Sequence, residues 1–564
     1  MSMDPLGILR DFDTELFVSR FEELHAAIYK QTTQKVEVLL WDKVLGAVGE
    51  GEVEGAQAEL ILRAAIKCQD EVVIGYAQAL PPASWLWALR RIPVHHFLGS
   101  TAASRHERRH LAEVFSGKYG MPLSPHSHFS EPPVLDVEQI EAVARFTVSA
   151  VLLSRLHAMY RMCGKGAAIL LRRDRMPVVK ASEGVAESVR RYEERRGLSA
   201  TRTGARAGTI VVERVEEAGS DTLICARALP AGTWIQMDVS HGIAGGGANS
   251  TPSPQMLVFA RWVPVELSVE RISRLRGRRS DWWRPEFIYL IALMRCAQRV
   301  ARQEDAGGFF PTLCRVGYVI GARVTFESMF AASIDMDRQY LGRLFNVDGQ
   351  SLTASEGVTL LGEMGSTWPT SSGPPLRFGV DKVYIDLDSC GFLLELYSDF
   401  GLVQKDGPIV NVRAEHFEQE IQLAIDSSPW VPVPKVRAIR GKTLRRSGQS
   451  FTDIDAIGEQ GDRLLLVSVK SFPLTWEYAR GEYTAVRNME SKVRQAVMEW
   501  SDVLDSLKAD PVGDNFDFRD YSSISGVIVL PFAPHLSSQF KAEVTRGLPA
   551  VCSPAEFDVL LNDA

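Results

Sequence analysis

Two apolar runs toward the C-terminal end constrain the fold of this chain more than any other feature. Residues 452–457 read Thr-Asp-Ile-Asp-Ala-Ile and residues 463–470 read Arg-Leu-Leu-Leu-Val-Ser-Val-Lys, with the polar turn Gly-Glu-Gln-Gly-Asp between them. Strand side chains alternate between two faces, so the runs predict two paired strands. Pairing brings Asp455 and Lys470 to neighbouring positions on one sheet.

Polar and apolar side chains separate within these runs. Asp453 and Asp455 are expected on one face of the first strand, while Ile454, Val467 and Val469 are expected to face a core. A carboxylate beside a lysine at a sheet edge can hold a divalent cation and stabilise a phosphate group in transfer. The hairpin is therefore a candidate site for phosphate chemistry.

Helix and strand patterns flank the hairpin in a definite order. Residues 415–425 have the apolar spacing of an amphipathic helix, which contains Phe417 and Glu418. Residues 482–507 are helix-like, 524–530 form a buried-strand run, and 553–561 form a helix with Ser at its cap and Pro in its first turn. The order is helix, strands, helix, strand, helix.

This arrangement resembles the PD-(D/E)XK nuclease superfamily, in which an Asp on one strand and a (Glu/Gln)-x-Lys on the next assemble a magnesium-dependent phosphodiesterase. The resemblance covers only the C-terminal part, from about residue 415. It implies a restriction-endonuclease-like mixed sheet, with Glu418 and Asp455 as ligands of Mg²⁺ or Mn²⁺ and Lys470 beside the phosphate. The alternative from the residues alone is an ordinary hairpin with a solvated acidic edge.

One position departs from the family pattern. Ser468 stands where the family usually has Glu or Gln, and a neutral hydroxyl is a weak ligand for a hard cation. Ser468 could still hydrogen-bond a reacting water, and Glu482 or Glu477 could supply the missing carboxylate from the helix entry. A nuclease fold that has lost catalysis and only binds remains the alternative.

Basic residues are local features, because the chain carries a formal net charge of −7. The candidate nucleic-acid contacts are Arg437, Arg440, Lys442, Arg445 and Arg446, together with Arg274, Arg278 and Arg279 from the stretch 271–284, which also holds two tryptophans. A third group, between residues 172 and 196, alternates with glutamates and is expected to be a solvated helix face.

Another motif, His106-Glu107-Arg108-Arg109-His110, matches the H-E-x-x-H zinc-protease string. The arginines within it favour a solvated basic helix instead, because such zinc helices are usually apolar and buried.

Composition bounds the remaining possibilities. A chain of 564 residues with 45% hydrophobic and 24% charged residues, no apolar run of about 18 residues and no secretion signal suggests a soluble cytoplasmic protein without a membrane partner. Seven cysteines without C-x-x-C spacing suit a reducing compartment.

We expect a multidomain α+β chain that includes a domain of the α/β class. The expected divisions are a helical domain at 1–135, a mixed α/β domain at 136–270, a mixed recognition region at 271–405 and the nuclease-like domain at 406–564, with a proline-rich linker near 122–133.

The expected function is that of a metal-dependent endonuclease acting on nucleic acid, most plausibly DNA, as a restriction or anti-phage defence effector. It could work with protein partners or as a homo-oligomer. The competing expectation is a catalytically inactive binding or scaffold protein.

Overall fold

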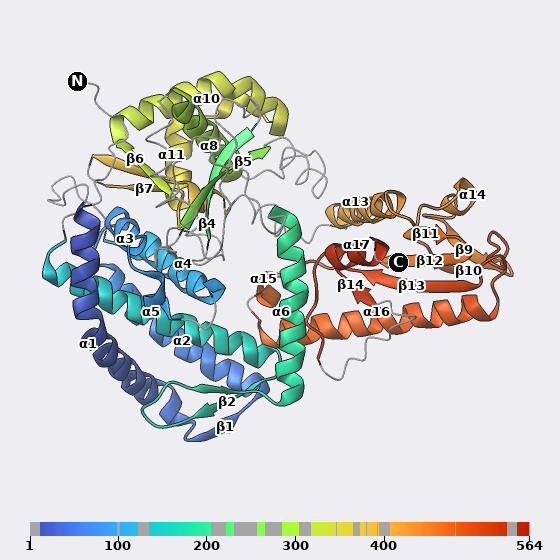
Figure 1. Cartoon of the computed structure of the whole chain (residues 1–564), viewed down its shortest axis with the longest axis horizontal. Helices are drawn as coiled ribbons and strands as arrows, with labels where there is room; N and C mark the ends of the chain where they lie inside the picture. The colour runs from blue at the N-terminus through green and yellow to red at the C-terminus, as the bar shows by residue number, and fades with distance from the viewer. Residues whose placement is uncertain are drawn as a thin grey trace, which may run out of the picture.

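The computed structural model describes residues 12–98, 102–121, 135–204, 222–229, 257–264, 285–303, 317–345, 347–364, 373–379, 381–391, 393, 407–479, 481–537 and 550–562. These residues form helices and small sheets of the general α+β class (Figure 1). The expected proline linker and the basic stretch 271–284, which holds Arg274, Arg278 and Arg279, lie outside the described residues.

Three long helices form the N-terminal layer: α1 (Phe12–Lys43), α2 (Gly55–Ala77) and α5 (Val137–Gly164). Asp136 begins α5 with a capping box that includes Gln139. Helix α5 is apolar around most of its circumference, and it packs against both α1 and α2. The apolar core therefore continues across residue 135, where we had expected a domain boundary.

Shorter elements surround this layer. They are η1 (Leu45–Ala47), β1 (Gly51–Val53), α3 (Pro82–Leu89), η2 (Val94–Phe97), α4 (Ala102–Tyr119), β2 (Ala168–Leu171), β3 (Val178–Lys180) and α6 (Glu183–Gly204). Strands β1, β2 and β3 form an antiparallel sheet in that order.

A middle unit has its own apolar core. It contains α8 (Pro285–Gln303), β6 (Tyr318–Ala322), α10 (Arg323–Phe345), η5 (Gly349–Ser351), α11 (Ala354–Glu363), β7 (Leu376–Phe378) and β8 (Lys382–Asp386), beside the antiparallel pair β4 (Thr222–Leu229) and β5 (Leu257–Pro264). The three-stranded antiparallel sheet has the order β6-β8-β7.

The C-terminal unit is a sheet between helices. Its elements are α13 (Gly407–Asp426), α14 (Pro434–Arg437), β9 (Thr443–Arg446), β10 (Gln449–Asp453), β11 (Ala456–Gln460), β12 (Arg463–Val469), α15 (Trp476–Ala479), α16 (Tyr483–Ala509), β13 (Ser523–Val529), β14 (Val551–Cys552) and α17 (Pro554–Asn562). Strand order is β11-β12-β13-β14, with β11 antiparallel to β12 and the others parallel. Helices α13 and α17 cover one face, and α16 covers the other (Figure 1).

The run 452–457 is not one strand, contrary to our expectation. Strand β10 ends at Asp453 and pairs with β9 in a separate two-stranded sheet, while β11 begins at Ala456. A tight turn joins β9 to β10, in which Ser447 and Gly448 have φ values of 52° and 75°, as a two-residue hairpin turn requires. Asp453 and Asp455 therefore do not share a face of one strand.

The C-terminal unit contacts the N-terminal helices, including α2, α5 and α6. Arg195 of α6 donates to the Glu556 carboxylate of α17 at 2.6 Å and to the Pro534 carbonyl at 3.0 Å. At the end of α5, a Cβ on Gly164 would clash with the carbonyl oxygen of Gly481, so only glycine permits this approach. Every helix in the described part of the chain is too short or too polar to cross a bilayer.

Candidate active site

Asp455 is fixed at the entry to β11. The register pairs Ala456 with Val467, so Asp455 lies beside the end of β12. Its Oδ2 accepts a hydrogen bond from the Val469 amide at 2.7 Å, and its main-chain carbonyl accepts one from Arg440 Nε at 3.2 Å. These contacts hold the carboxylate where β12 ends.

Glu418 approaches the same place from α13. Its neighbours Phe417 and Ile421 are buried against the sheet, which leaves Glu418 half-buried at the rim of the helix–sheet interface. Asp455 raises the pKa of Glu418, whereas Arg440 and Lys470 lower it. Glu418 is therefore an electrostatic neighbour of Asp455.

Gln422, one turn after Glu418, fixes α13 to the edge of the sheet. Its side chain is buried, accepts the Ile457 amide at 2.9 Å and donates to the Ile457 carbonyl at 3.0 Å. Strand β11 is an edge strand, so these backbone groups have no partner strand on that side. Gln422 thereby sets the position of Glu418 relative to Asp455, a role that the sequence analysis missed.

Lys470 directly follows β12. Its amide donates to the Val529 carbonyl of β13 at 3.0 Å, which continues the parallel pairing, and the residue is half-buried. Lys470 lowers the pKa of both Glu418 and Asp455. The structure thus brings together Glu418, Asp455 and Lys470, which the sequence analysis had proposed as one site.

Burial is the largest influence on the pKa of each carboxylate in this group. Burial raises the pKa of Asp455, and Asp453 raises it further, against opposing contributions from the Val469 amide, Lys470 and the Ser468 hydroxyl. Burial also raises the pKa of Glu418, with Asp455 as the next cause. The cationic neighbours therefore do not fully offset the cost of ionising the two carboxylates.

Ser468 contacts Asp455 directly, whereas Glu482 has an arginine of another helix as its neighbour. Ser468 is 4% exposed and hydrogen-bonds Asp455, without adding charge. Glu482 precedes α16, and its carboxylate lies 3.8 Å from Arg63 of α2. Arg63 is thus a charged neighbour of Glu482, and our expectation that Glu482 or Glu477 supplies the missing carboxylate stays a prediction. Glu477 is exposed on α15.

Some of the basic residues predicted to bind nucleic acid have partners within the protein, whereas others are exposed. Arg437 forms an ion pair with Asp426, and Arg446 donates to Ser506 Oγ at 2.9 Å and lies over the Phe451 ring. Arg440 lies at the site, whereas Lys442 and Arg445 are exposed on and before β9.

The arginine–glutamate group between residues 172 and 196 is partly internal. Arg190 pairs with Glu187 on an exposed helix face, as expected, but Arg195 pairs with Glu556 across the contact between α6 and α17.

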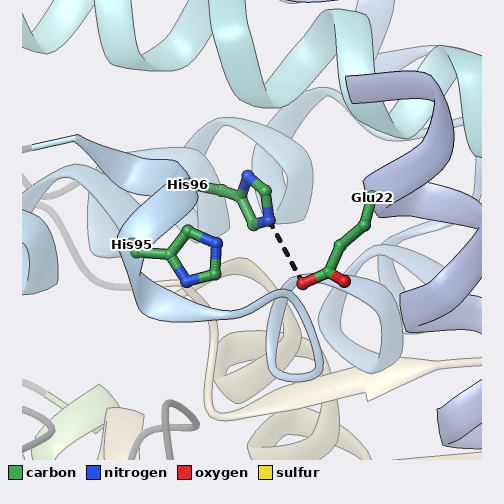
Figure 2. A group of neighbouring side chains, drawn as sticks. All are labelled: Glu22, His95 and His96. Atoms are coloured by element: carbon green, nitrogen blue, oxygen red, sulfur yellow. Dashed lines mark ion pairs between the residues drawn. The ribbon is translucent and has the colours of Figure 1, made fainter. Parts of the chain in front are cut away.

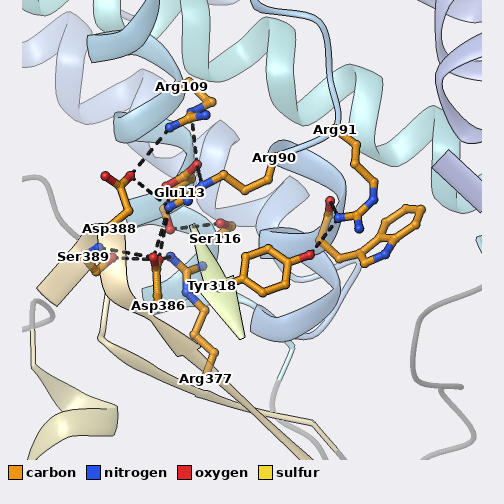
Figure 3. Close-up of polar contacts among 11 residues, drawn as sticks. Arg90, Arg91, Arg109, Glu113, Ser116, Tyr318, Arg377, Asp386, Asp388 and Ser389 are labelled. Atoms are coloured by element: carbon orange, nitrogen blue, oxygen red, sulfur yellow. Dashed lines mark hydrogen bonds and ion pairs between the residues drawn. The ribbon is translucent and has the colours of Figure 1, made fainter. Parts of the chain in front are cut away.

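A second charged cluster lies between the N-terminal layer and the middle unit (Figure 3). Arg90 donates to Glu113 at 2.8 Å and to Asp386 at 3.2 Å, and Arg109 lies 3.1 Å from Glu113. Arg109 is 1% exposed, so the expectation of a solvated helix for the H-E-x-x-H string is wrong there. Burial alone would raise the pKa of Glu113, but Arg109 and Arg90 hold it well below its usual range.

Comparisons of the chain with protein-family models, with curated proteins and with solved structures found no match.

Proposed function

We propose that the C-terminal unit is a divalent-metal-dependent phosphodiesterase that cleaves nucleic acid. The observation that carries the proposal is the group at the end of β12, where burial raises the pKa of both Glu418 and Asp455, Asp455 adds to the effect on Glu418, and Lys470 lies close enough to lower both pKa values. The order of helix, strands, helix and strands around this group agrees with the resemblance to PD-(D/E)XK nucleases stated above.

The residues present fit a hard divalent cation. Two carboxylates whose pKa values are raised by burial and by repulsion gain most from a nearby positive charge. Mg²⁺ commonly uses one or two protein carboxylates and keeps several waters, so two carboxylates are sufficient for binding. When bound, Mg²⁺ or Mn²⁺ would polarise a phosphate oxygen and acidify a coordinated water.

The chain's own side chains have separate roles in this proposal. Glu418 and Asp455 hold the cation, with Asp455 oriented by the Val469 amide and Glu418 by the Gln422 clamp. Lys470 stabilises the charge that develops on the phosphate. Ser468 orients Asp455 as a hydrogen-bond donor.

A nucleic-acid substrate follows from the exposed cations beside the group. Lys442 and Arg445 are exposed, form no ion pair with another described residue, and lie just before and on the hairpin that leads into Asp455. A backbone of phosphates passing over this hairpin would contact both residues on its way to Lys470. Duplex DNA is the substrate that we propose.

Binding without cleavage is a second candidate. Ser468 favours it, because the usual acidic ligand is replaced and Glu482 is held by Arg63. In that case the group would bind a cation and a phosphate backbone but would leave the backbone intact.

The test is cleavage of plasmid DNA and of single-stranded RNA with Mg²⁺, with Mn²⁺ and with a chelator. We expect metal-dependent cleavage that Asp455→Asn and Lys470→Met each abolish. Glu420→Gln is the matched control, since Glu420 is exposed on α13 two residues from Glu418. Cleavage at the wild-type rate by both site variants contradicts the proposal, and DNA binding without cleavage supports the second candidate.

A further inference from the structure

Four ligand-type side chains gather at the other end of the chain. Glu22 and His25 lie one turn apart on α1, while His95 and His96 are consecutive in η2. Aromatic packing joins α1 to η2 and to the preceding α3, because the Phe21 and His96 rings meet edge-to-face with centroids 5.2 Å apart and the Phe17 and Trp87 ring centroids are 5.1 Å apart. The cluster therefore rests on a well-packed core.

Three of these side chains converge on one point (Figure 2). One ligand atom from each of Glu22, His95 and His96 lies within 4.8 Å of the other two. His96 Nε2 is 3.7 Å from the Glu22 carboxylate. Tetrahedral ligands at zinc distances are separated by about 3.4 Å, so only small side-chain rotations separate this arrangement from a coordinated one.

We propose that Glu22, His95 and His96 bind one divalent transition-metal ion of the zinc type. Two imidazoles and one carboxylate suit Zn²⁺ and its neighbours, whereas Mg²⁺ and Ca²⁺ prefer oxygen ligands. The Glu22 and His95 side chains are exposed and His96 is half-buried, so the remaining coordination positions face solvent. The site is separate from the carboxylate pair of the C-terminal unit and does not depend on the nuclease proposal.

His25 acts behind the ligands as a positioning residue. Its Nδ1 lies 3.2 Å from His96 Nδ1, so one of these nitrogens donates to the other. If His96 Nδ1 carries the proton, then His96 Nε2 is unprotonated and directs a lone pair toward Glu22. A histidine that binds a metal requires such a free lone pair. His96 Nε2 is buried and has no hydrogen-bond partner among the described residues, which agrees with a role as a metal ligand.

A packing role does not account for the whole group. His25 and His96 are covered by neighbouring aromatic rings, and burial lowers the pKa of each to about 4, which keeps both imidazoles neutral. Glu22 and His95, however, are exposed and contribute little to the core. Their convergence on His96 Nε2 is the feature that metal binding explains.

The test is titration of the chelator-stripped full-length protein with Co²⁺, followed by its visible absorption, and then displacement by Zn²⁺. We expect one equivalent to bind at the cluster. Glu22→Gln and His95→Ala should each weaken binding by at least about tenfold, and His25→Gln by about 10- to 100-fold through loss of orientation. Both first variants change exposed side chains, so folding should be retained.

Two controls locate the effect. Glu23→Gln alters the adjacent exposed carboxylate, which pairs with Arg20, and should bind as the wild type does. Asp455→Asn should also bind Co²⁺ normally. Zn²⁺ should raise the melting temperature of the wild type and of both controls, but not of Glu22→Gln. Absence of Co²⁺ binding by the wild type, or equal binding by Glu22→Gln and His95→Ala, overturns the proposal.

Discussion

The two charged clusters of this chain are built from the same residue types but have opposite electrostatics. In the cluster between the N-terminal layer and the middle unit, the carboxylates meet buried arginines, and the pKa of Glu113 is held low. At the end of β12, Lys470 and Arg440 do not offset burial and repulsion, and the pKa values of Glu418 and Asp455 are raised. In the first cluster each carboxylate has an arginine beside it, whereas the carboxylates of the second gain from an added cation.

Arginines lie beside each carboxylate of the first cluster (Figure 3). The Asp386 carboxylate accepts hydrogen bonds from Arg90 at 3.2 Å and from the Ser389 hydroxyl at 2.8 Å. Asp388 lies 3.3 Å from Arg90. Because Arg90 follows α3 and Asp386 ends β8, the cluster joins two units that are nearly 300 positions apart in sequence. Its role is to hold these units together.

The largest expected effect is on stability in the first cluster. Glu113→Gln leaves Arg90 and Arg109 buried without their shared counter-charge, which should lower the free energy of unfolding by about 3–5 kcal/mol. Urea denaturation measures the change, with Glu71→Gln, an exposed glutamate of α2, as the control. A loss below about 1 kcal/mol would mean that the cluster contributes little.

The pH dependence of this contribution has a definite sign. The folded pKa of Glu113 is depressed, so its stabilising effect is present above the ordinary glutamate pKa of about 4.3 and is lost as pH falls toward the folded value. Wild type and Glu113→Gln should therefore converge in stability under strongly acidic conditions.

A smaller loss of stability is expected when Gln422, which fixes α13 to β11 beside the second cluster, is changed. Gln422→Met removes both hydrogen bonds to Ile457 and leaves buried backbone groups unsatisfied, at a cost of about 1–3 kcal/mol. Gln419→Met, on the exposed side of the same helix, is the matched control for thermal denaturation. Equal melting temperatures for the two variants would show that α13 is held by its apolar contacts alone.

Removing a carboxylate from the second cluster should not destabilise the protein. The raised pKa of Asp455 means that its ionisation costs folded-state stability as pH rises from its unfolded pKa of about 3.9 through the higher folded value. Asp455→Asn retains an oxygen for the Val469 amide and removes that cost. Without divalent cations at pH 7, its melting temperature should equal or exceed that of the wild type.

A decrease comparable to that of Glu113→Gln would instead show that Asp455 is structural. Asp502→Asn, at an exposed position of α16, controls for a general effect of removing charge.

The smallest effect concerns nucleic-acid binding. Replacing Lys442 and Arg445 with Gln should reduce the slope of log affinity against log salt by about 1.8 on duplex DNA, if each contacts one phosphate. Arg437→Gln is the control, because Arg437 is paired with Asp426. Fluorescence anisotropy at several salt concentrations measures the slopes, and an unchanged slope in the double variant places the contact surface elsewhere.

Much of the C-terminal fold was predictable from local patterns. Residues 415–425 lie within α13, 482–507 match α16 closely, and 524–530 match β13, because each carries a strong apolar period. The proximity of Asp455 and Lys470 also followed, since strand pairing fixes neighbours once two strands are recognised.

Features that depend on distant partners were not predictable. The ion pair of Glu482 with Arg63 joins α2 to the start of α16, and no local signal marks it. Arg109 belongs to a string that reads as solvated, yet it is buried because Glu113 and Asp388 compensate its charge. Gln422 could have been suspected as a polar residue on the apolar face of α13, one turn after Glu418.

The most direct test of the difference between the two clusters is isothermal titration of Mg²⁺ into the full-length protein at pH 7. We expect the wild type and Glu420→Gln to bind one Mg²⁺ with equal affinity, while Glu418→Gln and Asp455→Asn lose that binding. Mg²⁺ binding that is unchanged in both site variants, or absent from the wild type, would contradict the claim that this carboxylate pair is a cation site.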